Sequence, residues 1–226
     1  DGIRDIGVTG VQTCALPIFQ ALRYKQFPMY NLTSGLLEKT SSHSPTMLLS
    51  NFFGDTVTGF FSFSMRIISA PSAIVAKAIG DIFRQEAIKE YDRSNNCKNL
   101  FIKTFFKLIA LSGVPFILFY LFAPEIFEIV FGQQWKIAGQ YAKILTPMFF
   151  LQFVVSPLSN MFLIAEKQKI DFIIQVALLG MVMGSFYLGY SLFKNPDFCI
   201  LLYAVTYCIK YIFELLLSYQ FSLGKK

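Results

Sequence analysis

The chain has 226 residues, of which 54% are hydrophobic, 15% are charged and 26 are phenylalanine, and its mean hydropathy is +0.52. Soluble globular domains usually contain about 25% charged residues, so the composition excludes an ordinary soluble domain and indicates an integral membrane protein. A net charge of +6 would suit a nucleic-acid-binding protein, but the basic residues form short clusters between apolar runs, and membrane topology explains that distribution better.

Residues 1–18 stand apart from the rest of the chain. The sequence DGIRD followed by VTGVQTCALPI resembles the conceptual translation of a short-read sequencing adapter. We therefore expect residues 1–18 to be an artefactual, unstructured segment and the native sequence to begin near Phe19. The alternative is a genuine N-terminal tail.

The first predicted helix, at about residues 27–53, is the least lipid-like span. Its polar residues recur at steps of three and four, which places them on one side of a helix. This strip, which we expect to line water, comprises Asn31, Ser34, Glu38, Ser41 and Ser42. His43, the one histidine of the chain, is a candidate proton relay, although a hydrogen-bonded structural side chain is the favoured interpretation.

The second predicted helix, at about residues 56–91, organises the rest of the chain. One face carries small and polar residues at helical spacing, and the other positions are rich in Phe and Ile. That face comprises Gly59, Ser62, Arg66, Ser69, Ala73, Lys77, Asp81 and Arg84. An arginine within a membrane span costs about 2.5–3.5 kcal/mol on insertion scales, so Arg66 should face a cavity or a partner rather than lipid.

Four further spans are predicted at about residues 99–123, 136–165, 168–193 and 197–223. A short amphipathic segment at 124–131 is predicted to lie at the membrane interface. The last span contains Lys210 and Glu214 one turn apart, which we expect to form an ion pair within the helix. The sequence thus predicts an all-α integral membrane protein, a bundle of six transmembrane helices.

The distribution of Lys and Arg assigns the loops to the two sides of the membrane. One side gathers Arg23, Lys25, Arg84, Lys89, Arg93, Lys98, Lys103, Lys167, Lys169, Lys225 and Lys226. The other side combines fewer basic residues with acidic ones: Lys136, Lys143, Lys194, Asp55, Glu125, Glu128 and Asp197. We therefore expect the first side to be cytoplasmic, with both ends of the native segment inside.

Several stretches together resemble a known family. They are, in order, YKQFPMY, LLSNFFGD, TGFFSFSMRIISAPSAIVAKAIGDIF, LFAPEIFEIVFGQQWKIAGQYAKIL and PLSNMFLIAEKQ. This order resembles the C-terminal half of bacterial polysaccharide flippases, the O-antigen and exopolysaccharide members of the multidrug, oligosaccharidyl-lipid and polysaccharide exporter superfamily. The resemblance implies two six-helix bundles around a central cavity, with residues 19–226 as the second bundle and the N-terminal bundle missing.

The resemblance also implies a function, the movement of an undecaprenyl-diphosphate-linked oligosaccharide across the bacterial inner membrane by alternating access, for lipopolysaccharide or exopolysaccharide synthesis. The partners would be this lipid-linked oligosaccharide, the lipid bilayer and the missing half, with no nucleic acid. We expect no enzymatic activity, catalytic residue, metal or cofactor, because the sequence lacks the corresponding motifs, and the identity of a coupling ion, Na+ or H+, stays open. Two alternatives are a drug or small-cation exporter of the same superfamily and a membrane-embedded polysaccharide polymerase or glycosyltransferase.

The residues predicted to line the substrate cavity are Arg66, Lys77, Glu38 and Ser62. Arg66 and Lys77 share a helix face at a separation of about 16 Å along the axis, so both could meet an anionic diphosphate. Arg66 is expected to be the freer charge, because Asp81 stands one turn from Lys77 and can pair with it. In the alternative interpretation, Arg66 pairs with Glu38 or with a carboxylate of the missing half and only holds helices together.

Overall fold

The computed structural model describes residues 26–224, which form six long helices, one short helix and one turn of 3-10 helix. The elements are α2 (Gln26–Phe53), α3 (Asp55–Ser94), α4 (Lys98–Phe131), η1 (Gln133–Trp135), α5 (Lys136–Leu158), α6 (Met161–Ile164), α7 (Gln168–Phe193) and α8 (Pro196–Ser222). The expected adapter-derived segment 1–18 lies outside the described residues.

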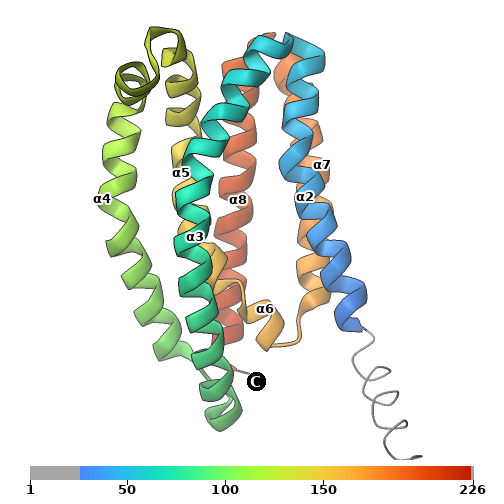
Figure 1. The fold of residues 1–226 in the computed structure, drawn as a ribbon. Coiled ribbons are helices and arrows are strands. Elements are labelled where there is room, and N and C mark those ends of the chain that lie inside the picture. The colour runs from blue at the N-terminus through green and yellow to red at the C-terminus, as the bar shows by residue number, and fades with distance from the viewer. Residues whose placement is uncertain (1–25, 225–226) are drawn as a thin grey trace, which may run out of the picture.

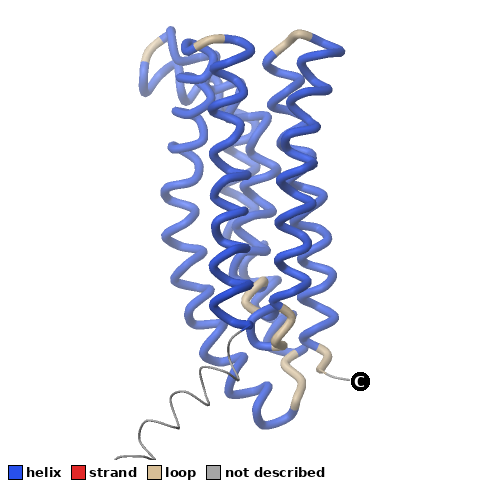
Figure 2. Tube along the Cα trace, turned by 90° about the vertical axis from the view of Figure 1, so that its right-hand side faces the viewer, coloured by secondary structure: helices blue, strands red, loops and turns tan. Residues whose placement is uncertain are grey.

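The six long helices lie side by side and alternate in direction (Figure 1), and Figure 2 shows that the loops gather at the two ends of the bundle. No strand occurs among residues 26–224, so the predicted all-α class is confirmed. Short connections enforce the alternation, because they leave too little chain for parallel neighbours. The α3–α4 and α6–α7 connections therefore lie at one end, and those between α2 and α3, α4 and α5, and α7 and α8 lie at the other.

Five of the long helices are long and apolar enough to cross a membrane, and α2 is the exception. The serine, threonine and charged residues of α2 lower its hydropathy, as the polar strip in the sequence predicted. Nevertheless α2 runs alongside α7 (Figure 1), and the ring centroids of Phe52 and Tyr190 stack 4.4 Å apart near its end. A polar helix therefore belongs to the bundle and is held there by its neighbour.

Two predicted boundaries differ from the structure. The segment 124–131 is not a separate helix but the last turns of α4, which contains Pro124 and ends at Gly132, where φ is +100°. Figure 1 shows these last turns nearly end-on at the top of the bundle, so the end of α4 turns away from its main axis. The predicted helix 136–165 is interrupted after Leu158, and α6 follows as a separate four-residue helix.

α4 and α5 approach each other closely at Gly139. A Cβ atom on Gly139 would lie 2.5 Å from the Cα of Pro124 and 2.8 Å from the carbonyl oxygen of Ala123. One residue away, the buried Ser64 hydroxyl of α3 donates to the carbonyl oxygen of Ala138 at 2.6 Å. Small side chains thus let α3, α4 and α5 meet at this level, which is how tightly packed membrane helices associate.

Candidate functional site

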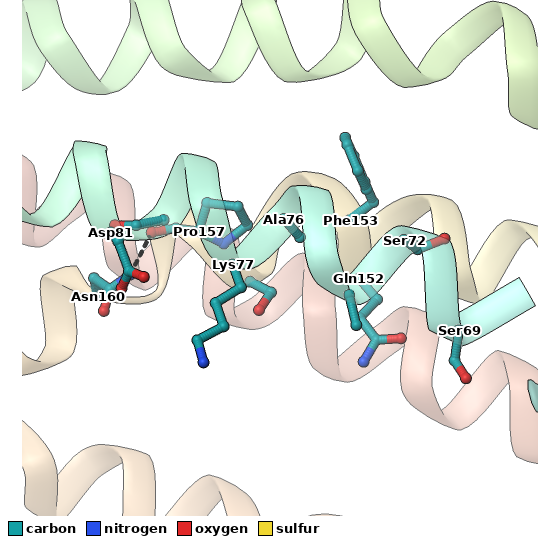
Figure 3. Close-up of a pocket in the computed structure, with 12 residues that line it drawn as sticks. Ser69, Ser72, Ala76, Lys77, Asp81, Gln152, Phe153, Pro157 and Asn160 are labelled. Atoms are coloured by element: carbon teal, nitrogen blue, oxygen red, sulfur yellow. Dashed lines mark hydrogen bonds between the residues drawn. The ribbon is translucent and has the colours of Figure 1, made fainter.

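A polar cavity of about 310 Å³ lies between α3 and α5, and we call it the Lys77 cavity. Its α3 wall consists mainly of small and hydroxyl-bearing residues, which leave room beside the helix. The polar residues of its lining are Ser69, Ser72, Lys77, Asp81, Gln152, Ser156 and Asn160. In Figure 3 the side chains of Lys77 and Gln152 point to the same side, away from α4, so a cation and an amide face the same space.

Asn160 fixes the end of the Lys77 cavity. Its amide nitrogen donates to the carbonyl oxygen of Pro157 at 2.9 Å and makes a longer contact with that of Gly80 at 3.5 Å. α3 and Asn160 are in van der Waals contact at this point, since a Cβ on Gly80 would lie 3.4 Å from the Asn160 amide nitrogen. The interruption between α5 and α6 therefore serves to tie α5 to α3 at the cavity.

A second polar cavity of about 280 Å³ lies among α2, α5, α7 and α8, and we call it the carboxylate cavity. Three carboxylates from three different helices line it, namely Glu38 of α2, Asp171 of α7 and Glu214 of α8. The single cation among its lining residues is Lys210 of α8. Carboxylates inside a membrane bundle are rare and usually mark a functional path, so this cavity is the most unusual chemical feature of the described residues.

Lys210 and Glu214 form the predicted ion pair. Nζ of Lys210 lies 2.9 Å from Oε1 of Glu214, and the two side chains are 3% and 5% exposed. Nζ also lies 4.4 Å from the centroid of the Tyr211 ring, which favours the cation further. Because Lys210 and Glu214 balance each other, Glu38 and Asp171 are left without a cation in this cavity.

Two buried polar atoms beside these carboxylates lack a partner. The Gln175 amide nitrogen donates to Oδ1 of Asp171 at 3.3 Å, but Oε1 of Gln175 has no hydrogen-bond partner. The hydroxyl of Ser34 is also unpartnered, and both residues are 4% exposed. Since an unsatisfied buried polar atom costs free energy, these two atoms indicate a ligand or water in the cavity.

The two cavities adjoin each other. Gln152, Ser156 and Asn160 of the α5–α6 segment line both of them. Sequence reasoning missed these three residues because they are isolated in a highly apolar span. Their spacing of four residues was the available signal, since it places them on one helix face.

The predicted site residues divide into two groups. Lys77 lines the first cavity and Glu38 lines the second. Arg66, Ser62 and His43 line neither cavity; Arg66 and His43 are exposed, and Ser62 is half-buried. All three charged residues are exposed, and what separates them is that Lys77 and Glu38 line adjoining cavities whereas Arg66, closer to the start of α3, lines neither.

Neither the Arg66–Glu38 pair of the alternative interpretation nor the pairing of Lys77 with Asp81 is present among the described residues. Within residues 26–224 the ion pairs shorter than 4.0 Å are Lys210–Glu214 and Lys136–Glu128, the latter at 2.8 Å. Lys77 is therefore a freer cation than the sequence predicted. The described residues also contain no group of three or more His, Cys, Asp or Glu side chains that could hold a metal ion.

The fold and the cavities together define an all-α membrane bundle with a polar interior. The chain belongs to a family described as "Polysaccharide biosynthesis protein", whose profile matches residues 14–139. This match covers more than half of the chain and includes α2, α3 and α4, and with them Lys77 and Glu38. Searches of the curated proteins and of the solved structures returned no match.

Proposed function

We propose that the protein moves an oligosaccharide linked to a polyprenyl diphosphate across the bacterial inner membrane, as a step in lipopolysaccharide or exopolysaccharide synthesis. Membership of a polysaccharide biosynthesis family supports the process. The observation that carries the proposal is the Lys77 cavity, a polar space between two apolar helices whose lining includes an exposed, unpaired lysine. No covalent step is part of the proposed activity, so the protein acts as a transporter and not as an enzyme.

The chemistry of the substrate fits this arrangement. A diphosphate needs cations and hydrogen-bond donors, and Lys77 of α3 and Gln152 of α5 supply them. A polyprenyl chain needs only an apolar environment, which the bilayer provides, so just the head group has to enter the protein. Discontinuous or interrupted helices that bind substrate at polar interfaces are a general feature of transporters, and the α5–α6 interruption at the cavity agrees with it.

The orientation is part of the proposal. The end of the bundle with the α3–α4 connection carries Arg93, Lys98 and Lys167, and it would face the cytoplasm. The opposite end, with Lys136 and Glu128, would face outwards. Alternating access would then require a second bundle, such as the one that the resemblance implies, to close the exposed face of α3.

Export of a small organic cation is the second candidate function. Glu38, Asp171 and Glu214 around one cavity favour it, because carboxylates attract cations. The family match favours the first candidate. A direct comparison of the two substrate types with the same preparation separates them.

The test is a flipping assay with the intact protein in proteoliposomes that contain a fluorescent lipid-linked oligosaccharide. Lys77→Gln should lower the flipping rate about tenfold or more, equivalent to losing about 1.4 kcal/mol of stabilisation at the rate-limiting step. Lys77→Arg should keep most of the activity, because it keeps the charge. Lys103→Gln is the matched control, since Lys103 is an exposed lysine of α4 that lines neither cavity.

The proposal makes a clear distinction between outcomes. Equal flipping by the wild type, Lys77→Gln and Lys103→Gln would contradict the role of the Lys77 cavity. Transport of organic cations without any flipping of the lipid-linked oligosaccharide would favour the second candidate instead.

A further inference from the structure

We infer that the carboxylate cavity is a sugar subsite that admits neutral or amino sugars and rejects acidic ones, so that it sets the substrate class of the transporter. This inference rests on the proposed function. It concerns a part of the site to which sequence reasoning assigned only Glu38.

The carboxylate cavity has a lining rich in acidic side chains. Three carboxyl side chains and one lysine line it, so the formal charges of these side chains sum to −2. Lys210 is already engaged by Glu214 at 2.9 Å and by the Tyr211 ring, so it is not available to a ligand. A second anion in this space would be repelled, whereas a neutral hydrogen-bond donor or a cationic group would be attracted.

The atoms without a hydrogen-bond partner in this cavity are side-chain oxygens of Gln175 and Ser34. Oε1 of Gln175 can only accept a hydrogen bond, and a carboxylate oxygen of Asp171 beside it is also an acceptor. Ser34 adds a hydroxyl that can accept or donate. These acceptors have no donor within the protein, and sugar hydroxyl groups or a sugar ammonium group would supply one.

The carboxylates of this cavity are not clustered in the way that metal ligands are. No group of three or more potential metal ligands of the His, Cys, Asp and Glu types comes together within residues 26–224. The ammonium group of Lys210 would also repel a metal cation that approached Glu214. A ligand with several spread-out donors matches the carboxylates, which come from three separate helices.

The position of the cavity completes the argument. It shares Gln152, Ser156 and Asn160 with the Lys77 cavity, where the diphosphate is proposed to bind. The first sugar is bonded directly to that diphosphate, so a neighbouring pocket is the place that the sugar would reach. Its volume of about 280 Å³ suits a small part of the oligosaccharide rather than a long chain.

The experiment measures binding of three synthetic lipids to the intact protein in nanodiscs. The lipids carry the same polyprenyl diphosphate and differ only in the sugar, which is glucose, glucosamine or glucuronic acid. The wild type should bind the glucuronic acid lipid about tenfold more weakly than the other two, because its carboxylate meets the negative cavity. Asp171→Asn and Glu38→Gln should each reduce this discrimination, and Asp92→Asn, at an exposed acid near the end of α3, should leave it unchanged.

Each outcome has a defined meaning. Equal binding of the three lipids by the wild type, or discrimination that the Glu38→Gln and Asp171→Asn variants leave intact, would overturn the sugar subsite without affecting the proposed function. Absence of binding by all three lipids would overturn both. Glu38 is exposed, so Glu38→Gln keeps the test valid if Asp171→Asn fails to fold.

Discussion

Lys210→Met is expected to destabilise the protein strongly, because it leaves Glu214 buried without its cation. The two side chains are 3% and 5% exposed, and their charged atoms lie 2.9 Å apart. Loss of one partner of a buried ion pair costs about 3–5 kcal/mol, whereas replacement of both partners by apolar side chains is often neutral. At about 2–4 °C per kcal/mol for a chain of this size, the single variant should lower Tm by about 6–20 °C.

The assay is thermal unfolding of the purified protein in one detergent, for the wild type, Lys210→Met, Glu214→Leu and the double variant. The double variant should recover most of the stability that either single variant loses, because no unpaired charge stays buried. A double variant whose loss equals the sum of the single losses would refute this reasoning, since it would mean that the two charges do not compensate each other.

Three further predictions concern the packing of α5 against α4, the orientation of the protein in the membrane, and Arg66. Gly139→Ala should lower stability by about 1–3 kcal/mol, measured by thermal unfolding, because its Cβ would collide with the α4 backbone; an unchanged Tm would contradict the close contact. A cysteine placed at Gln133 should react with an impermeant thiol reagent added outside intact cells, and one at Lys167 should not; the reverse pattern would invert the orientation. Arg66 lines neither cavity, so Arg66→Ala should lower the flipping rate less than Lys77→Gln does; a larger loss with Arg66→Ala, only partly restored by Arg66→Lys, would instead assign Arg66 the diphosphate-binding role that the sequence predicted.

The native cysteine Cys97 should not react in the labelling experiment. It lies between α3 and α4 and is fully buried. Burial, with a smaller contribution from the charge of Glu90, raises the pKa of its thiol to about 11. Because the thiolate is the reactive form, Cys97 would resist labelling from either side and reports on neither.

Hydropathy and loop length predicted the helices well, because both depend on local composition. The ends of α4 and α5 were harder to predict. Pro124 suggested a break, yet the helix continues to Gly132, where the backbone adopts a positive φ. The end of α5 depends on the tertiary contact of Asn160 with Gly80, which no local pattern contains.

The candidate site was only partly predictable for a similar reason. Lys77 and Glu38 were identifiable as polar residues on predicted helices. Asp171 and Gln175 could not be identified from the sequence. They become neighbours of Glu38 and Glu214 only when α7 packs between α2 and α8. Sequence also predicted the Lys210–Glu214 pair but not that it faces a cavity, because spacing within a helix does not reveal what lies opposite.

Photo-crosslinking tests the central claim most directly, namely that the polar cavities hold the substrate head group. A photoreactive amino acid would replace Gln152, which lines both cavities, or Val114, which is 66% exposed on α4. The substrate carries its radiolabel in the sugar. After crosslinking, mild acid separates the polyprenyl chain from the sugar diphosphate. An adduct formed through the polyprenyl chain therefore loses the label, and an adduct formed through the head group keeps it. We predict an acid-resistant label at position 152 that unlabelled substrate competes away, and none at position 114; equal acid-resistant labelling of the two positions, or none at 152, would contradict the account.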